Sequence, residues 1–475
     1  MRFTGDAGDT FTPAILNPVA MAFFCTLALL VVGQFLGAWQ SVAFANGGMI
    51  IWLTAAIAFL AIAVCARAEP ETEERARKAL PVLLVAVLSM FAAGQLFASY
   101  LVFRTDIAIW LLLTGLVLLY NVRRKVPSLH ECRTRILPVV MLGFLLVSIR
   151  TIRNDPHPPI DVFVAQQAAA EGMSKLRNPY TATIPDIYGP ASPYYIPLTE
   201  NGRTLYGSSY PPLITILNLP AFLLAGDIRY GYVLLLLLSC GLIALMQTSW
   251  PALCGAVLLL MNPFSQLLIV WAWVEPVAIL TFCLTLFSVS RYPKAVPWLL
   301  GLFLASKQTN LAILPLALML VENPWEWKKV AGFFAKALAV VGAIYIPFYL
   351  WDPAAFVLSL ITVQLKIPMR RDEISYAAYA ARNGWFVLPI WLPFLWLPVG
   401  IYLGLRKAPR SAAGFAAASA LTLITFFALS KQGAANYYFL VLGMLCCSLG
   451  LMNMSYGDQS QFPADTKVSV MAPPD

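Results

Sequence analysis

The chain has 475 residues, of which 60% are hydrophobic and only 12% are charged. Soluble domains have about 45–50% apolar and about 25% charged residues, so this composition excludes a soluble protein. It also excludes a disordered chain, a collagen and a disulfide-rich secreted scaffold, because each needs a polarity, a glycine period or a cysteine density that is absent here. At roughly 20 residues per span, the chain has room for about 12 to 14 transmembrane helices. We therefore expect an all-α polytopic membrane protein.

The formal net charge is +9, and the basic residues gather in loops between apolar runs. A nucleic-acid-binding domain would instead cluster them on a soluble face among stacking aromatic residues. Basic loops are typical of the cytoplasmic side of membrane proteins, where they set the topology and contact lipid headgroups. We therefore expect membrane lipids, and no nucleic acid, among the partners.

Apolar runs near 14–38, 49–66, 80–102 and 106–121 predict a four-helix transmembrane unit over residues 1–121. The loops between them differ in charge: 67–78 and 122–135 are rich in Lys and Arg, whereas 39–46 has no charge. The positive-inside bias therefore places the N-terminus and the basic linker 122–135 in the cytoplasm, and we expect a multi-pass membrane protein.

Residues 136–453 are the expected core. A span near 136–148 leads to the longest polar stretch, 150–210, which is therefore an extracytoplasmic loop. Spans near 211–226 and 229–247 follow, and the segment 250–290 is interrupted at Asn262-Pro263 and at Glu275-Pro276. Proline breaks helices, and broken helices persist in a membrane only where the freed backbone groups face protein or water. We therefore expect a cavity there.

The run 297–321 is interrupted by polar residues at 306–310 and has two interpretations. As a hairpin of two short helices, it returns the lysines at 328–329 to the cytoplasm, turns a second loop, 351–385, outward and leaves the basic residues at 406–410 inside. As one span, it inverts all the later loops. The positive-inside bias favours the hairpin. The last spans are expected near 386–404, 413–429 and 435–453, and the tail 454–475 is expected to be disordered.

Two acidic residues near the start of the long outer loop are candidates for catalysis. Apolar residues recur with helical spacing from Asp161 to Leu176, which predicts an amphipathic helix on the membrane surface. Asp161 either caps this helix by accepting hydrogen bonds from free backbone donors, or acts as a general base facing a cavity. The two interpretations are compatible. Asp155 is the alternative base, although the proline-rich turn after it also explains its presence.

Tyrosines are frequent in the same loop. Their rings stack on sugars and their hydroxyls form hydrogen bonds, but tyrosines also anchor proteins at the membrane interface. The candidates are Tyr180, Tyr188, Tyr194, Tyr195, Tyr206 and Tyr210.

Ionisable residues beside apolar stretches are a second group of candidates, because a charge at the bilayer centre costs about 3 kcal/mol or more. Lys307 and Glu275 are such residues, either as a structural ion pair or in a binding role. Basic residues in or beside the outer loops either bind a phosphate or snorkel to the interface. These are Lys366, Arg370, Arg371, Arg382 and Lys431.

Several familiar catalytic patterns are missing from the sequence. It has no GxxxxGK[ST] phosphate loop, no HExxH, no GxSxG and only two histidines, His130 and His157. A hydrolase with a Ser-His-Asp mechanism is therefore disfavoured. We expect no metal and no cofactor.

The order of several short motifs resembles the GT-C superfamily of polyprenol-phosphate-sugar-dependent glycosyltransferases, in particular the bacterial members related to mannosyl- and arabinosyltransferases. The motifs lie between about 136 and 453 and are IDVFVAQQAAAEG from Ile160, NPYT from Asn178, YPPL from Tyr210, SKQTNLAILP from Ser306, WDPAAF from Trp351, RRDEISY from Arg370 and KQGAANYYF from Lys431. The resemblance implies a GT-C-like helical bundle with a long structured outer loop, and sugar transfer to a cell-envelope glycan or glycolipid.

The resemblance also implies roles for individual residues. Asp161 would be the general base and Asp155 the fallback. Lys307, Arg370, Arg371 and Lys431 would bind the donor phosphate, while Tyr180, Tyr194, Tyr195, Tyr210, Glu275 and Gln308 would bind substrate. No DxD pair occurs, which fits a metal-independent reaction of a single lipid-linked phosphate. The family places its acid in the first outer loop, so the four spans of 1–121 must be an addition.

Two other functions fit the same features. A lipid-linked saccharide flippase or transporter would also need many spans, a polar cavity and basic phosphate contacts. An O-antigen polymerase or ligase would instead rely on Arg and His of the outer loops and a diphosphate donor. The long outer loop favours the transferase, which would be inverting or retaining.

Overall fold

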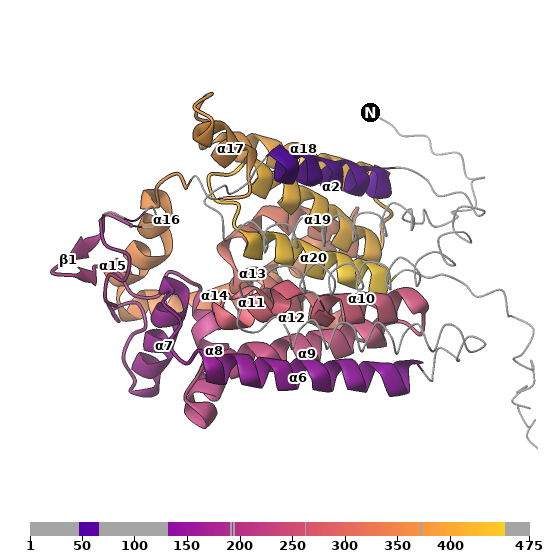
Figure 1. Cartoon of the computed structure of the whole chain (residues 1–475). Coiled ribbons are helices and arrows are strands. Elements are labelled where there is room, and N and C mark those ends of the chain that lie inside the picture. The colour runs from indigo at the N-terminus through magenta and orange to yellow at the C-terminus, as the bar shows by residue number, and fades with distance from the viewer. Residues whose placement is uncertain are drawn as a thin grey trace, which may run out of the picture.

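The computed structural model describes residues 47–65, 132–190, 192, 195–261, 263–370 and 373–451, and their regular secondary structure is almost entirely helical (Figure 1). The expected spans near 14–38, 80–102 and 106–121, the linker 122–131 and the tail lie outside the described residues. The elements up to the bend in the bundle are α2 (Gly47–Cys65), η1 (Cys132–Ile136), α6 (Leu137–Asn154), α7 (Asp161–Ser174), β1 (Thr199–Glu200), β2 (Arg203–Thr204), α8 (Pro212–Ala225), α9 (Arg229–Met246), α10 (Trp250–Met261) and α11 (Pro263–Val270).

The remaining elements continue the all-α architecture to residue 450. They are α12 (Glu275–Arg291), η2 (Pro293–Ala295), α13 (Val296–Ser306), η3 (Gln308–Leu320), α14 (Trp327–Trp351), α15 (Pro353–Val357), η4 (Leu358–Thr362), α16 (Val363–Lys366), α17 (Tyr376–Arg382), α18 (Leu392–Lys407), α19 (Ala412–Leu429) and α20 (Ala435–Gly450).

The long helices lie side by side, and α7, α15, α16 and the strands gather at one end of them, here called the loop end (Figure 1). Hydrogen bonds join the connections at the opposite, basic end. They run from Arg133 to Thr248 (3.3 Å), Arg291 to the carbonyl of Leu245 (2.7 Å), Gln247 to that of Leu451 (2.9 Å), Ser448 to that of Ala413 (3.0 Å) and Arg410 to that of Val321 (2.6 Å). We call this end the basic end because Arg133, Arg291 and Arg410 lie at it.

The interrupted run 297–321 forms a hairpin, as the charge pattern predicted. Helix α13 leaves the basic end, where Arg291 precedes it, and η3 returns to that end, where Arg410 binds the carbonyl of Val321. Lys307, in extended conformation, separates the two short helices. Consequently α14 starts at the basic end with Lys328 and Lys329, and α18 returns to it with Arg406 and Lys407.

Both predicted breaks in the segment 250–290 are present. Helices α10 and α11 meet at a 45° bend on either side of residue 262, and α12 begins at Glu275-Pro276. Between α11 and α12, the backbone of Ala272 adopts φ +52°, and Ala272, Trp273 and Val274 are buried. The freed backbone therefore faces protein, as it must at membrane depth.

The span expected near 211–226 is present at almost those bounds, but it is short for a transmembrane helix. Helix α8 has 14 residues, about 21 Å of helix, whereas a bilayer core is about 30 Å thick. It stops at Gly226, whose φ of +74° and N–H bond to the carbonyl of Phe222 form a left-handed cap. Both flanks contact the loop end: Gln308 binds the carbonyl of Ser209, and Gln167 binds that of Gly226.

Four helices of the described residues, or five if the bent pair α10–α11 counts as one, are long and apolar enough to cross a membrane. Helix α19 is central, because 83% of the residues in its apolar stretch are buried inside the protein. Helix α14 is peripheral, because only 6% of its apolar stretch is buried. Small residues let α19 pack closely: Ala416, Ala417 and Ala418 are fully buried. The protein is an all-α polytopic membrane protein.

Candidate active site

The outer loop begins with a surface helix at the predicted place. Helix α7 starts at Asp161 after a proline-rich turn, and Val162, Ala165 and Ala169 are buried as the periodicity predicted. It ends two residues earlier than expected, at Ser174, and Leu176 follows with φ +56° and 86% exposure. The buried stripe fixes the rotation of α7, and therefore the direction of its first side chain.

Asp161 is the first residue of α7, and its carboxylate binds one backbone donor and one tyrosine. Its Oδ1 accepts hydrogen bonds from the Val162 N–H (2.9 Å) and from the Tyr188 hydroxyl (3.1 Å). The same hydroxyl oxygen accepts the backbone N–H of Asp161 (3.3 Å). The carboxylate therefore satisfies one free backbone donor of the first turn, as the capping interpretation expected, and the residue is only partly buried.

The charge of Asp161 interacts with a basic residue from the distant second loop. Burial raises the pKa of Asp161 above its ordinary value, while the Tyr188 hydrogen bond and the positive charge of Arg370 act in the opposite direction. Burial and then the negative charge of Asp161 likewise raise the pKa of Tyr206 and of Tyr210. The charge of Asp161 therefore interacts with Tyr206, Tyr210 and Arg370 as well as with its hydrogen-bond partner Tyr188, and we call these five residues the outer cluster.

A second polar group lies in the bundle next to the outer cluster. The Lys307 ammonium forms an ion pair with Oε1 of Glu275, and the two residues are 5% and 0% exposed. The Asn436 amide donates to the same oxygen (2.8 Å), and the Tyr437 ring lies 3.8 Å from the Lys307 ammonium. We call Glu275, Lys307, Asn436 and Tyr437 the inner cluster.

Tyr210 of the outer cluster also interacts with the inner cluster. After burial and Asp161, the groups that raise the pKa of Tyr210 are Tyr437 and Glu275 of the inner cluster. Its neighbour Ser209 accepts the amide of Gln308, the residue after Lys307, at 3.3 Å. The structure therefore brings Asp161, Tyr210, Glu275, Lys307, Gln308 and Arg370 together, although they come from five separate segments.

The other predicted basic residues are held by the chain itself. Arg370 forms an ion pair with Glu373 (3.3 Å), whose second oxygen accepts the Gly433 N–H (3.0 Å). Lys431 donates to the carbonyls of Ile367 (2.7 Å) and Leu365 (3.4 Å), and burial lowers its pKa. These contacts fasten the second loop to the start of α20. Arg371 lies outside the described residues.

The remaining predicted tyrosines have structural contacts. Tyr180 is buried, donates its hydroxyl to the carbonyl of Tyr210 (2.9 Å) and packs edge-on against Phe348 and Phe356. Tyr195 shares a hydrogen bond with Thr199 at the start of the hairpin β1–β2 (2.8 Å). Tyr194 lies outside the described residues. Tyr180 therefore holds the backbone of Tyr210 in place through this hydrogen bond.

Arg229 anchors the turn that leads to α7, a role that the sequence did not suggest. It is fully buried, binds the Asp227 carboxylate through two nitrogens and donates to the carbonyl of Asp155 (2.8 Å). Its guanidinium also lies 4.7 Å from the ring of Phe163 on α7. The backbone of the fallback acid Asp155 is thus part of the scaffold that positions Asp161.

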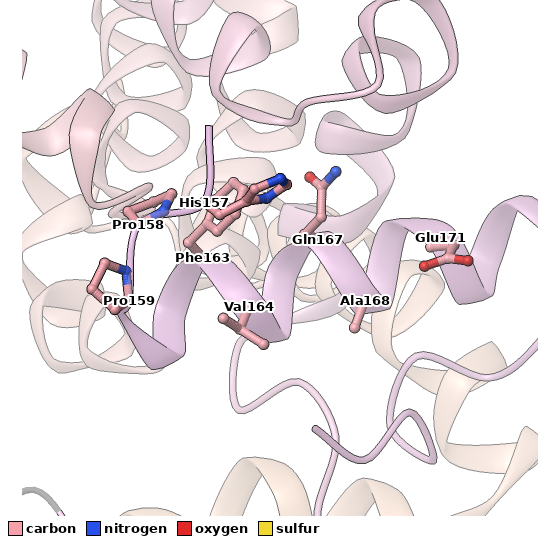
Figure 2. A pocket seen from close by; sticks show the side chains of 8 residues that line it. All are labelled: His157, Pro158, Pro159, Phe163, Val164, Gln167, Ala168 and Glu171. Carbon is pink, nitrogen blue, oxygen red and sulfur yellow. The ribbon is translucent and has the colours of Figure 1, made fainter. Parts of the chain in front are cut away.

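A pocket of about 320 Å³ lies on another side of α7 (Figure 2). Its eight lining residues are His157, Pro158, Pro159, Phe163, Val164, Gln167, Ala168 and Glu171. Two of its polar side chains are occupied, because Gln167 binds the backbone of Gly226 and Ile228, and Glu171 binds Lys175. No residue of either cluster lines this pocket.

Sequence reasoning missed several residues of the two clusters. Tyr188 and Tyr206 were candidates only as members of a tyrosine-rich loop, and nothing local distinguished them from the other four. Asn436 and Tyr437 lie within KQGAANYYF, and Glu373 lies within RRDEISY, so the motifs marked the right segments. Their partners lie elsewhere in the chain, which a local pattern does not reveal.

The chain matches no protein-family model and no curated protein. Among solved structures, it is similar to ArnT from Cupriavidus metallidurans, whose crystal structure was determined bound to undecaprenyl phosphate. The sequence identity is 14% and the TM-score is 0.45. The similarity covers 68% of this chain and 60% of that chain, which is less than two thirds of the length of ArnT.

Proposed function

We propose that the protein is a membrane glycosyltransferase that moves a sugar from a polyprenyl-phosphate donor to a hydroxyl of a cell-envelope glycan or glycolipid. The observation that supports this most is the outer cluster: a partly buried carboxylate at the start of a surface helix, next to a guanidinium and three tyrosines. A base, an anion-binding group and sugar-binding rings are what this transfer requires.

Asp161 is the proposed general base. The acceptor hydroxyl gives its proton to Oδ of Asp161 while its oxygen bonds to the anomeric carbon of the donor. The bond from that carbon to the phosphate oxygen breaks, and polyprenyl phosphate leaves. A raised pKa makes the carboxylate a stronger base than one in water, and such proton transfer typically contributes about 10²–10⁴-fold. No step requires a metal.

Lys307 is the best supported phosphate ligand. An ammonium has three N–H donors, and within the described part of the chain only one of them forms a hydrogen bond, to Glu275. The other two are available to the oxygens of a phosphate, on which charge builds as the bond breaks. The positive charge of Arg370 acts on Asp161. Arg371, the next residue, and Lys431, just before α20, are proposed to assist.

Tyr210, Tyr206 and Gln308 are proposed to contact the sugar, with Tyr180 acting through its bond to Tyr210. Glu275 is proposed to act through Lys307. Tyr194 and Tyr195 are proposed to contact the acceptor. Tyr195 shares a hydrogen bond with Thr199 at the start of the hairpin β1–β2, which lies at the loop end (Figure 1).

The distribution of charge supports an extracytoplasmic site. The basic end holds Arg133, Arg291, Lys328, Lys329 and Arg410, which the positive-inside bias assigns to the cytoplasm. The two clusters lie towards the other end, at the long loop. We therefore propose that the reaction takes place outside the bacterial inner membrane, and that the N-terminus is cytoplasmic.

The proposal is tested by transfer of radiolabelled sugar from a panel of polyprenyl-phosphate sugars in membranes with and without the protein. The expected result is protein-dependent transfer from at least one donor, together with release of polyprenyl phosphate. If the purified protein instead carries a diphosphate-linked lipid by mass spectrometry and transfers no sugar from any monophosphate donor, the proposal is wrong.

A further inference from the structure

The first turn of α20 contacts both partners of the buried ion pair. Asn436 donates its side-chain amide to Oε1 of Glu275 (2.8 Å), the oxygen that Lys307 also approaches. The next residue, Tyr437, places its ring face 3.8 Å from the Lys307 ammonium. Two consecutive residues therefore act on the two charges separately, the amide on the carboxylate and the ring on the ammonium.

Lysine needs such support to be a directional ligand. Its ammonium sits on a flexible four-carbon stem, and fixing that stem costs side-chain entropy. Here Glu275 holds the ammonium from one direction and the Tyr437 ring from another, in a site where both charges are buried. A cation over an aromatic face is strongly attracted when both are desolvated. The position of the charge is therefore fixed before any ligand binds.

The fixed ammonium also lies near the outer cluster. Gln308, the residue after Lys307, donates its amide to the carbonyl of Ser209, the residue before Tyr210 (3.3 Å), and the charges of both Asp161 and Glu275 act on Tyr210. Glu275 binds both Lys307 and Asn436 through Oε1, and its Oε2 accepts no hydrogen bond from any described residue. The Oδ1 of Asn436 likewise accepts none from a described residue. The ion pair is thus end-on, and it leaves N–H donors of Lys307 for an anion.

We propose that Asn436 and Tyr437 are positioning residues for Lys307, and that they set the affinity of the site for the phosphate group of a polyprenyl phosphate. This inference rests on the proposed function, because it takes the phosphate of the donor as the ligand of Lys307. Neither residue touches the reacting atoms. They act through Lys307, Tyr437 on the ammonium and Asn436 on its carboxylate partner.

The test compares binding of two lipids to the purified full-length protein in detergent: undecaprenyl phosphate and the uncharged alcohol undecaprenol. The Tyr437→Leu variant removes the aromatic face and is expected to bind undecaprenyl phosphate about 10–30-fold more weakly, which corresponds to loss of a desolvated cation–π contact. Binding of undecaprenol is expected to stay as in the wild type. Tyr437→Phe keeps the face and is expected to restore most of the phosphate affinity.

A matched control exists at the other end of the bundle. Arg406 lies 5.9 Å from the ring of the exposed Tyr402, so Tyr402→Leu removes a cation–aromatic contact far from the clusters, and both lipids should bind it as they bind the wild type. Asn436→Leu supplies an independent variant that removes the amide from Glu275 and is expected to weaken phosphate binding only.

The outcomes separate the two proposals. If the wild type binds undecaprenyl phosphate and Tyr437→Leu and Asn436→Leu bind it equally well, the positioning role is wrong and the proposed function stands. An equal loss of undecaprenol binding in these variants would show a general structural defect and also overturn the positioning role. If the wild type does not distinguish undecaprenyl phosphate from undecaprenol, the phosphate site is wrong, and both proposals fall.

Discussion

Arg229 offers a quantitative test of how the scaffold holds Asp161. The guanidinium is fully buried, while the Asp227 side chain is 15% exposed and receives bonds of 2.6 and 3.0 Å. In Arg229→Met, a side chain of similar length, the carboxylate loses its partner and the Asp155 carbonyl loses its donor. An unpaired buried charge costs about 3–5 kcal/mol, and an unsatisfied buried acceptor adds about 1–3 kcal/mol.

The structure also predicts how much of the stability lost in Arg229→Met comes from the unpaired charge of Asp227. Adding Asp227→Asn to Arg229→Met removes the stranded charge, so the double variant should recover part of the stability, and a double-mutant cycle should give a coupling energy above about 1 kcal/mol. Arg229→Lys keeps a charge but not the planar fork, and is expected to fall between the wild type and Arg229→Met.

The assay is thermal unfolding in detergent, with sugar transfer measured on the same samples. Because Arg229 fixes the turn before α7, transfer by Arg229→Met should fall more than the folded fraction does, by up to about 100-fold for a misplaced base. The control is Arg410→Met, because Arg410 is an exposed arginine that also donates to a backbone carbonyl. This variant should leave the unfolding temperature and the rate of sugar transfer nearly unchanged. Unfolding of Arg229→Met at the wild-type temperature, or transfer at the wild-type rate, would refute the anchoring role.

Two further predictions follow from the site and the loop. Tyr188→Phe removes the hydrogen bond that favours ionised Asp161, so the pKa of Asp161 should rise further. Because the base must be ionised, the acid limb of the pH profile of kcat/KM should move to higher pH, and an unmoved limb would contradict the role of Asp161. A Cβ at Gly207 would lie 2.4 Å from the carbonyl oxygen of Pro179, so Gly207→Ala should lower the unfolding temperature. Gly332→Ala, where a Cβ meets open space, is its control, and equal effects would show that the close approach is unimportant.

The sequence predicted those parts of the fold that depend on local chemistry. Pro263 and Pro276 mark the breaks in the segment 250–290, because proline removes a backbone donor wherever it occurs. The apolar spacing from Asp161 predicted α7, and the lysines at 328–329 favoured the hairpin. In each case a few neighbouring residues determine the outcome. Helices α8 and α9 also lie at almost the bounds of the spans expected near 211–226 and 229–247.

The candidate site was predictable only in part, because its geometry depends on contacts between distant segments. Asp161 and Lys307 were identified from their own surroundings. Their partners Arg370 and Tyr437 follow more than a hundred residues later, and only the fold brings them together. Arg229 resembles an ordinary basic residue at a helix start, and one of its partners is the backbone carbonyl of Asp155, in the distant turn after α6.

The most direct test of the central claim is sugar transfer by Asp161→Asn compared with Glu171→Gln. Asn keeps the oxygen that caps α7 but cannot accept the proton, and Glu171 is an exposed carboxylate on the same helix. We predict that Asp161→Asn binds undecaprenyl phosphate like the wild type while its turnover falls by about 10²–10⁴-fold, and that Glu171→Gln keeps its turnover. Turnover by Asp161→Asn at the wild-type rate would contradict the account and favour a transporter.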